Sequence, residues 1–326
     1  MSPAKIARPD ENVLSSNERR RGVLFVLAAA ITWSTGGLGV KLVDAHPATI
    51  AGFRSLFAAA VLLLGFVRAA SRQGIDAKDA ARMLVRRWTI VGASVGYATM
   101  VVCFVFATKL TTAANAILIQ YAAPIYVALF SWPLLRERLR WWDWLAVTGC
   151  IAGLVLFFRD QVSSSGRLGD LVAVVSGLGF ASLPLLLRLE QRRLEGGDPE
   201  QMRLVALAPL FACFLGNVVA VGVCLPWMIS DPPHGSVAWT VLAGLGIIQI
   251  GLAYVFYSAG VRRLRAVEST LVCTLEPILS PVWVLLGTGE RPTVNAILGG
   301  ALIVLAVTAQ GVLAGIATAA TRRENA

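Results

Sequence analysis

The hydrophobic positions of this chain fall into long runs, and short stretches rich in charged and turn-forming residues separate them. Most runs approach the roughly 20 residues that a helix needs to cross a bilayer. The pattern predicts an all-α membrane protein with ten spanning helices. They are residues 22–43, 47–67, 88–108, 112–134, 141–158, 168–187, 204–229, 237–260, 266–286 and 293–316. Residues 1–21 are polar and aperiodic, so we expect them to be disordered in the cytoplasm, and residues 317–326 to form a cytoplasmic tail.

One motif of three residues occurs once in each half of the chain. An alanine is followed by a proline eleven residues later and by a glutamate thirteen residues after that. The two copies are Ala113, Pro124 and Glu137, and Ala266, Pro277 and Glu290. The chain therefore reads as two five-helix repeats, 22–158 and 168–316. Because five is odd, the second repeat must enter the membrane in the opposite sense, and inverted repeats are typical of alternating-access transporters.

Composition and charge agree with a membrane protein. Hydrophobic residues make up 56% of the chain and charged residues 15%, and the mean hydropathy is +0.70. A net charge of +10 raises the alternative of a nucleic-acid partner. However, 23 of the 29 Lys and Arg residues fall in segments expected on one side, which is the positive-inside pattern. The charge therefore predicts that both termini lie in the cytoplasm and that the protein has no nucleic-acid partner. We expect the membrane to be the inner membrane.

Other chemistries find little support in the sequence. The five cysteines lie in apolar runs without CxxC spacing, so we expect packing residues and no disulfide framework or metal site. The phosphate-binding pattern GxxxxGK[ST] is absent, so we expect no cofactor and a transport process that is gradient-driven or facilitated. The arginines at 19–21 resemble the start of a signal peptide, but the following apolar run is too long for one and predicts a retained helix.

One carboxylate is expected near the middle of the bilayer. Glu276 lies about ten residues, or roughly 15 Å, into its span. Helical spacing places Ser269, Ser280 and Trp283 on the same face, and such a polar stripe suits a cavity better than lipid. Glu276 could carry a proton, bind a substrate ammonium group or neutralise an internal arginine. The structural alternative is a hydrogen bond to backbone that Pro277 leaves free.

Arg54 is the second ionisable candidate. It lies about seven residues from the external end of its span, where a guanidinium could hold a substrate carboxylate through two parallel hydrogen bonds. The alternative is an interhelix bond to carbonyl groups or to Glu276. Lys41 and Asp44 lie closer to the external end and are expected to reach water.

Uncharged polar and aromatic residues on the repeat helices are further candidates for a central pocket. They are Trp33, Tyr97, Asn115, Gln120, Tyr121 and Gln249. Each could equally pack between helices, where one polar contact contributes only about 0.6 kcal/mol. As a group they predict a moderately polar, aromatic-containing pocket, which suits amino acids better than lipids. Gly149 and Gly153 favour close packing inside the protein over a dimer seam, so we expect a monomer or a weak homodimer.

An intramembrane hydrolase is the remote alternative. Residues 92–96 match the GxSxG pattern around Ser94. That motif needs a strand-to-helix turn and a nearby base, whereas Ser94 falls inside an expected helix, and His46 and His234 fall in external loops. We therefore expect no catalytic residues.

Several stretches carry a family resemblance. In the first half they are Trp33-Ser34, 54–57, 106–116 with Pro124, and the corner 136–139; in the second half they are 264–270, Glu276-Pro277 and 289–291. Together they resemble two copies of the EamA domain of the drug/metabolite transporter superfamily, with Pro292 as a departure after the second corner. The resemblance implies a ten-helix secondary transporter, often an exporter of amino acids or other small metabolites, with its substrate between the halves.

The expected function is export of amino acids or similar small amphipathic metabolites from the cytoplasm. The expected partners are a small-molecule substrate and the lipid bilayer. A carrier for another class, such as sugar nucleotides or lipophilic cations, is the alternative. Phosphate-bearing substrates would require several inward cations, and only Arg54 is available. Lipophilic cations would require an unpaired carboxylate, which Glu276 could provide.

Overall fold

The structure, a computed structural model, describes residues 16–135, 140–159, 164–194, 198–261, 263–264 and 272–324. Over these residues the chain is helical and contains no β-strand. The helices of the first half are α1 (Ser16–Ser34), α2 (Gly36–Leu42), α3 (Pro47–Arg72), α4 (Ala77–Val85), α5 (Trp88–Leu110), α6 (Ala113–Gln120), α7 (Ala123–Leu135) and α8 (Trp141–Arg159). Those of the second half are α9 (Ser164–Arg193), α10 (Pro199–Val205), α11 (Ala208–Ser230), α12 (Gly235–Ala243), the π-helix η1 (Gly244–Leu252), α13 (Ala253–Val261), α15 (Leu275–Thr288) and α16 (Val294–Glu324).

Polar residues and glycine at the ends of the apolar runs start and stop several helices. His46 accepts the N–H of Ala48 ahead of α3, and the Thr112 hydroxyl accepts the N–H of Asn115 at the start of α6. Such caps satisfy backbone N–H groups that a helix start leaves free. Gly289 ends α15 with φ of +74°, a left-handed conformation that glycine adopts at little cost.

Seven of the described helices are long and apolar enough to cross a membrane. They are Asn17–Leu42, Pro47–Arg72, Trp88–Leu110, Gly166–Arg193, Ala208–Ser230, Gly235–Gly260 and Val294–Leu313. Three shorter apolar helices, Ala113–Val127, Trp141–Leu156 and Leu275–Thr288, lie within the remaining three runs of the sequence. Each expected span therefore contains helix, although only seven reach spanning length over the residues described.

The fourth expected span is two helices and not one. α6 ends at Gln120 and α7 begins at Ala123. Pro124 explains the break, because a proline lacks an N–H and its ring crowds the carbonyl four residues earlier. In the second half, Thr274 interrupts the helix three residues before Pro277. The two repeats therefore share an interruption at corresponding positions.

Some helices are longer than the hydrophobic runs predict. α1 begins at Ser16, so residues 16–21 are helical and not disordered, and α16 continues as far as Glu324. The side chains of residues 17–21 at the start of α1 are exposed, so they can reach water while the helical hydrogen bonds continue past the apolar run. Residues 1–15 lie outside the described part of the chain. The eighth span is also irregular, since its middle is the π-helix η1.

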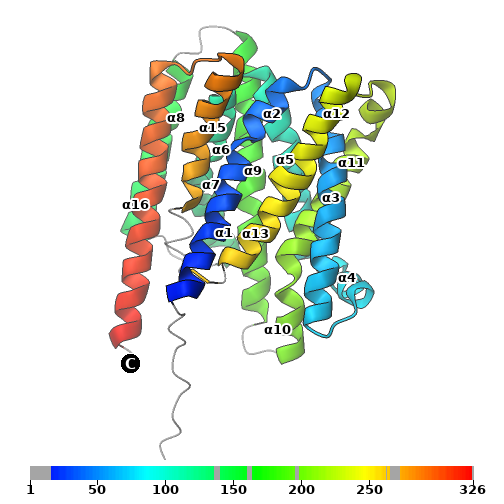
Figure 1. Ribbon diagram of the computed structural model, residues 1–326. Helices are drawn as coiled ribbons and strands as arrows, with labels where there is room; N and C mark the ends of the chain where they lie inside the picture. Colours follow the sequence, from blue (N-terminus) through cyan, green and yellow to red (C-terminus); the bar gives the residue numbers. More distant parts are fainter. Residues whose placement is uncertain are drawn as a thin grey trace, which may run out of the picture.

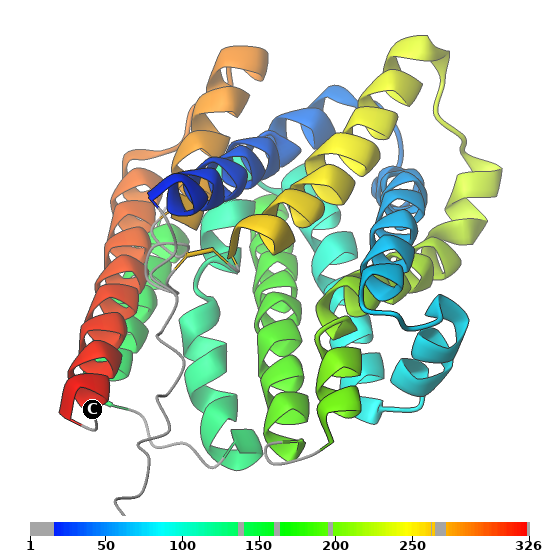
Figure 2. The ribbon, with the colours of Figure 1, turned by 60° about the horizontal axis from the view of Figure 1, so that its bottom comes forward.

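The packing of the helices repeats when the two halves are exchanged. α5, the third span of the first repeat, packs on α9, the first span of the second repeat. Conversely, α13 in the third span of the second repeat packs on α1 in the first span of the first repeat. α3 packs on α11, α8 on α16 and α6 on α15, and each pair joins corresponding spans of the two halves. α9 lies in the middle of the bundle (Figure 2). The repeats therefore interlock along their lengths.

Glycines permit two of these close approaches. A Cβ atom added at Gly149 would lie 2.5 Å from Ala306 Cβ, and one at Gly153 would lie 2.7 Å from the Gly299 carbonyl oxygen. Both glycines of α8 thus face α16 of the same chain, which confirms the prediction of internal packing. A Cβ added at Gly179 of α9 would lie 2.5 Å from the carbonyl oxygen of Gly96 on α5.

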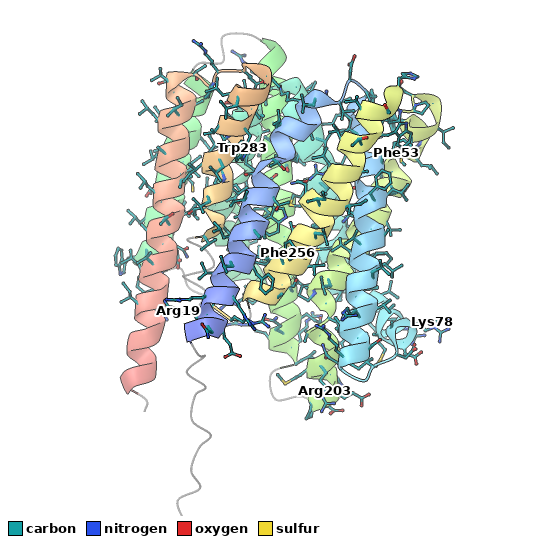
Figure 3. All side chains as sticks on the ribbon, in the orientation of Figure 1. Arg19, Phe53, Lys78, Arg203, Phe256 and Trp283 are labelled. Carbon is teal, nitrogen blue, oxygen red and sulfur yellow. The ribbon has the colours of Figure 1, made fainter. Side chains whose placement is uncertain are left out.

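The bundle has two ends, which we call the upper end and the lower end as they appear in Figure 1. The upper end carries the corners 43–46, 111–112, 231–234 and 289–293. The lower end carries α4, α10, the start of α1 and the end of α16. Figure 3 shows Arg19, Lys78 and Arg203 at the lower end. Three residues that the charge pattern assigns to the cytoplasm therefore share one end.

Candidate functional site

The interruptions of the two repeats meet through one hydrogen bond. Tyr121 lies in the break between α6 and α7, and Glu276 lies in the first turn of α15. The Tyr121 hydroxyl donates to Glu276 Oε2 at 2.7 Å, although 155 positions separate them in the sequence. Both residues are only partly buried. An ionisable side chain from one repeat is thus held by a polar side chain from the other.

Aromatic rings gather on α1, α5 and α13, and α1 also packs on α15, which carries Glu276. The Trp33 ring lies 5.1 Å from Tyr254 and 5.3 Å from Tyr257, measured between centroids. Tyr97 packs against Tyr254 at 5.6 Å. These rings come from α1, α5 and α13, so both repeats contribute to the cluster. Such a wall offers apolar area and ring faces that attract cations.

Arg54 carries the opposite charge into the same region. Its side chain on α3 is only 5% exposed, and its guanidinium lies 5.8 Å from the centroid of the Phe104 ring. Phe104 in turn belongs to the packed cluster against which Tyr121 lies, so Arg54 and the Tyr121–Glu276 contact share this part of the bundle. Over the described residues no hydrogen bond or ion pair joins Arg54 to Glu276, and its Nε and Nη1 atoms are buried without a hydrogen-bond partner. The alternative of a structural Arg54–Glu276 pair therefore finds no contact to support it.

Other buried polar atoms also lack partners within the described part of the chain. Three of them belong to predicted site residues on α1, η1 and α15: Trp33 Nε1, Gln249 Oε1 and Ser280 Oγ. Buried polar atoms in proteins are nearly always hydrogen-bonded to protein or water. Unsatisfied atoms on α1, η1 and α15 are therefore available to a polar molecule that enters this part of the bundle.

Four of the predicted site residues make structural bonds between helices. Trp283 Nε1 donates to Ser34 Oγ at 2.9 Å, which ties α15 to α1. Gln249 Nε2 donates to the Trp33 carbonyl oxygen at 3.1 Å. The other two bonds are Ser176 Oγ to Gln120 Oε1 at 2.8 Å, and Asn115 Nδ2 to Asp170 Oδ1 at 3.2 Å. Ser269, expected on the polar face of α15, lies outside the described residues.

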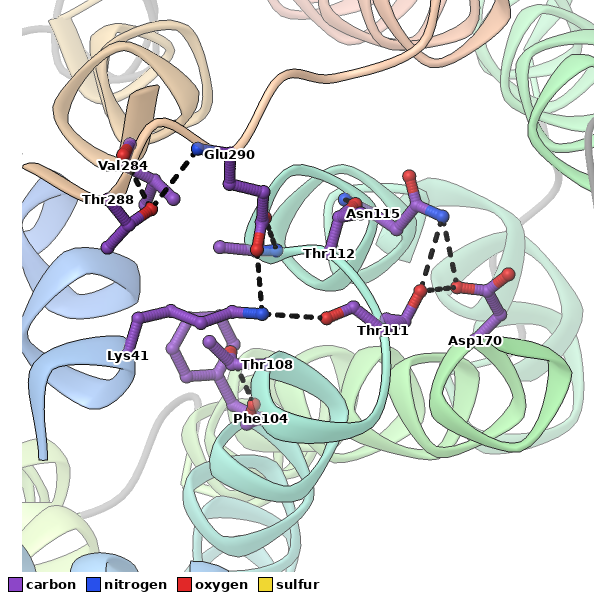
Figure 4. A network of polar contacts seen from close by, with 11 residues as sticks. Lys41, Phe104, Thr108, Thr111, Thr112, Asn115, Asp170, Val284, Thr288 and Glu290 are labelled. Atoms are coloured by element: carbon purple, nitrogen blue, oxygen red, sulfur yellow. Dashed lines mark hydrogen bonds and ion pairs between the residues drawn. The ribbon is translucent and has the colours of Figure 1, made fainter. Parts of the chain in front are cut away.

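A polar network at the upper end joins the two repeats a second time (Figure 4). Lys41 Nζ lies 2.8 Å from Glu290 Oε2 and donates to the Thr111 carbonyl oxygen at 3.0 Å. Glu290 Oε1 also accepts the N–H of Ala113, at the start of α6, at 2.8 Å. The Thr111 hydroxyl donates to Asp170 Oδ1 at 2.8 Å. The corner 289–293 is thereby attached to α2 and to the α5–α6 corner. Glu137, which corresponds to Glu290 in the first repeat, lies outside the described residues.

Another ion pair joins the repeats at the lower end. Arg87, just before α5, pairs with Glu190 of α9, and the Thr89 hydroxyl donates to the same carboxylate. Glu190 is only 3% exposed. Contacts between the repeats therefore exist at both ends of the α5–α9 pair.

Sequence reasoning missed Tyr254 and Tyr257 as well as the buried carboxylates Asp170 and Glu190. The two tyrosines lie three positions apart and thus share a helix face, which was a usable signal. Asp170 and Glu190 lie close to the ends of their apolar run, where a charged residue ordinarily reaches water. Their burial depends on neighbours from other spans, so no local pattern identifies them.

Two further expectations concern chemistry. The Ser94 hydroxyl is buried within α5 and donates to the Ile90 carbonyl oxygen, so Ser94 is not on a strand-to-helix turn. His46 caps α3. Within the described ranges, no three His, Cys, Asp or Glu residues gather in a way that could hold a metal ion.

The fold and the site define a class, a helical membrane protein in which two interrupted helices from matching halves meet at a polar and aromatic centre. That arrangement is typical of transporters. The chain belongs to the EamA-like transporter family, whose model matches residues 20–159 and again residues 167–309. The family resemblance inferred from the repeated motif is thereby confirmed.

Several proteins that are similar in sequence to this chain are named as transporters. An uncharacterized transporter of Archaeoglobus fulgidus is 25% identical over 67% of this chain and 74% of its own length. Human solute carrier family 35 member G1 is 23% identical over 87% of this chain and 77% of its own. The pseudopaline exporter CntI of Pseudomonas aeruginosa is 25% identical over 89% of this chain and 95% of its own. A crystal structure with 20% sequence identity covers 90% of this chain and 96% of its own with a TM-score of 0.57, which indicates a shared fold.

Proposed function

We propose that this protein is a secondary transporter of the inner membrane that exports amino acids or similar small amphipathic metabolites by alternating access. The observation that carries the proposal is the hydrogen bond from Tyr121 to Glu276, because it joins the interrupted helices of the two matching halves. Sites at such interruptions, near the membrane midplane, are typical of transporters built from inverted repeats. Export is supported by the similarity to a relative named as an exporter.

The proposed topology has ten spans, five in each of the repeats 22–158 and 168–316, with both termini in the cytoplasm. The start of α1 and the end of α16 share the lower end of the bundle, which supports an even number of crossings (Figure 1). The short helices α6, α7 and α15 then cross as interrupted spans. Interrupted backbone is tolerated at membrane depth where other protein or a water-lined space surrounds it.

The proposed role of Glu276 is to bind a substrate ammonium group or a coupling proton. It is a carboxylate within the helical bundle and accepts a hydrogen bond from Tyr121, which leaves most of its acceptor capacity free. Lipophilic cations are the second candidate cargo, because the rings of Trp33, Tyr254 and Tyr257 gather on α1 and α13, and α1 packs on α15, which carries this carboxylate.

The test is uptake by the purified protein in liposomes across a panel of amino acids and organic cations, with and without a pH gradient. We expect several amino acids to move and Glu276→Gln to lower their transport at least about tenfold, as expected for loss of a charge-assisted contact. Glu200→Gln, an exposed carboxylate on α10, is the matched control and should leave transport unchanged. Transport of cations alone would replace the amino-acid assignment, and a normal pH response in Glu276→Gln would remove its coupling role.

A further inference from the structure

Two opposite charges from different repeats lie in the same region without neutralising each other. Arg54 belongs to α3 and Glu276 to α15. Phe104, whose ring centroid lies 5.8 Å from the Arg54 guanidinium, belongs to the same packed cluster as Tyr121, which donates to Glu276. Within the described residues, Glu276 accepts a hydrogen bond from Tyr121, while the Nε and Nη1 atoms of Arg54 are buried without a partner. Each group therefore keeps most of its binding capacity.

The surroundings of Arg54 indicate which kind of chemical group its side chain can bind. The guanidinium is buried, its Nε and Nη1 atoms lack acceptors in the described structure, and Phe104 covers it from one side. A buried arginine is ordinarily held by a carboxylate or by several carbonyl groups, because its desolvation is costly otherwise. Its rigid, planar set of donors matches the two oxygens of a carboxylate. The group that best satisfies it is therefore an anion with two coplanar oxygens.

We propose that Arg54 binds the carboxylate of the transported molecule while Glu276 binds its cationic group, so that a zwitterion is selected and bridges the two repeats. This inference rests on the proposed function and narrows it. An amine without a carboxylate leaves Arg54 buried and unpaired, and a carboxylic acid without an amine leaves Glu276 unpaired. Leaving a buried polar partner unsatisfied is the physical basis of strong discrimination.

The aromatic cluster fits a zwitterion with an apolar body. Trp33 and Tyr254 lie on the α1 and α13 side with their ring centroids 5.1 Å apart, and Tyr254 also packs against Tyr97. An apolar side chain can pack on these rings while the two charges are bound from α3 and α15. A substrate held in this way makes contacts with both halves at once, and only such contacts can favour one arrangement of the halves over another.

The test compares matched molecules in liposomes that contain the purified full-length protein. The probes are leucine and phenylalanine, their decarboxylated amines 3-methylbutylamine and phenethylamine, and their deaminated acids 4-methylpentanoate and 3-phenylpropionate. We expect at least one zwitterion to move ten times faster than its amine and its acid. We expect Arg54→Gln to lower zwitterion uptake to the rate of the amine, and Glu276→Gln to lower it to the rate of the acid.

Two controls separate binding from folding. Arg54→Lys keeps the charge but not the planar set of donors, and we expect intermediate uptake from a normally folded protein. Arg82→Gln removes an exposed arginine on α4 and should change nothing. If thermal unfolding shows that Arg54→Gln is misfolded, the Arg54→Lys variant tests the proposal in its place. Wild-type zwitterion uptake by Arg54→Lys would then overturn the proposed role of Arg54 in binding the carboxylate.

The outcomes distinguish this inference from the proposed function. If amines move as fast as the zwitterions in the wild-type protein, transport stands and zwitterion selection is wrong. If Arg54→Gln carries zwitterions at the wild-type rate, Arg54 is a structural residue. If none of the zwitterions, amines or acids moves under any gradient, the proposed function fails and this inference fails with it.

Discussion

At the scale of single residues, the two repeats are alike in backbone and unlike in chemistry. Pro124 and Pro277 recur with the same interruption three residues earlier, since a proline has the same effect on helical hydrogen bonds in either repeat. Tyr121 corresponds to Thr274, and Glu276 corresponds to Ala123. The shared residues therefore shape the helices, whereas the unshared residues provide the polar contact between them.

Glycine determines how closely α5 and α9 approach. A Cβ added at Gly179 would lie 2.5 Å from the Gly96 carbonyl oxygen and 2.7 Å from the Met100 nitrogen, and backbone atoms cannot move aside as a side-chain tip can. We expect Gly179→Ala to lower the free energy of unfolding by about 1–3 kcal/mol through overpacking. The measurement is thermal unfolding in detergent.

Gly222 is the matched control for Gly179. It lies inside α11, and a Cβ added there has no neighbour within 4 Å. Gly222→Ala should be neutral or slightly stabilising, because alanine favours the helix by roughly 1 kcal/mol over glycine. Equal stability of the two variants would show that the α5–α9 contact tolerates an added methyl group.

At the scale of elements, the upper network attaches the α15–α16 corner to the first repeat. Glu290 accepts from Lys41 and from the N–H of Ala113, so one carboxylate pairs with a cation and also caps α6. Both side chains of the ion pair are about one-fifth exposed, at 19% and 23%. The corner can therefore separate from the first repeat only if Glu290 gives up both partners, Lys41 of α2 and the N–H of Ala113 of α6.

We expect Glu290→Gln to open the upper end more often, because the amide forms a weaker contact with Lys41 than the carboxylate does. The measurement is the rate at which a cysteine placed at Ser280, which is fully buried, reacts with a water-soluble thiol reagent. Severalfold faster labelling is expected. Lys109→Met is the control, because Lys109 donates to the Val43 carbonyl oxygen within the first repeat, and over the described residues no hydrogen bond or ion pair joins it to the second. Equal labelling in Glu290→Gln and the unaltered background would contradict this role.

At the scale of the whole molecule, the symmetric packing of corresponding spans makes the two halves one unit. Helices of one repeat pack along helices of the other and not mainly on their own neighbours in sequence. A change in which end is open must then involve movement along the α5–α9, α3–α11 and α8–α16 contacts. The close approach at Gly96 and Gly179 favours sliding over separation, since packed interfaces have few alternative arrangements.

The proposed topology predicts which corners face the outside of the cell. In intact cells, a membrane-impermeant maleimide should label a cysteine placed at His234, at the upper end, and not one placed at Asp198, at the lower end. Positive charge retained in the cytoplasm is the physical reason for this orientation. Permeabilised cells provide the control in which both positions react. The reverse labelling pattern would place the termini outside.

The sequence by itself determined the family, the duplication and the positions of the apolar helices. Hydropathy and motif spacing are local properties, and a helix satisfies its own backbone hydrogen bonds wherever it lies in the membrane. The interruption of the fourth span is not predicted from the sequence. Pro124 is part of the repeated motif, but the predicted span 112–134 runs through it. In the structure α6 ends at Gln120 and α7 begins at Ala123, so the span is divided just before the proline.

Only the tertiary structure decided which polar residues meet. Asn115 and Gln120 were predicted for a central pocket on equal terms with Tyr121, yet the structure bonds Asn115 to Asp170 and Gln120 to Ser176. Tyr121 instead meets Glu276, which lies 155 positions away. Periodicity places a side chain on a face of its own helix, but the partner of that face depends on how the two repeats pack. The sequence therefore supplies the polar groups, and the packing of the inverted halves decides which become structural bonds and which stay available to a substrate.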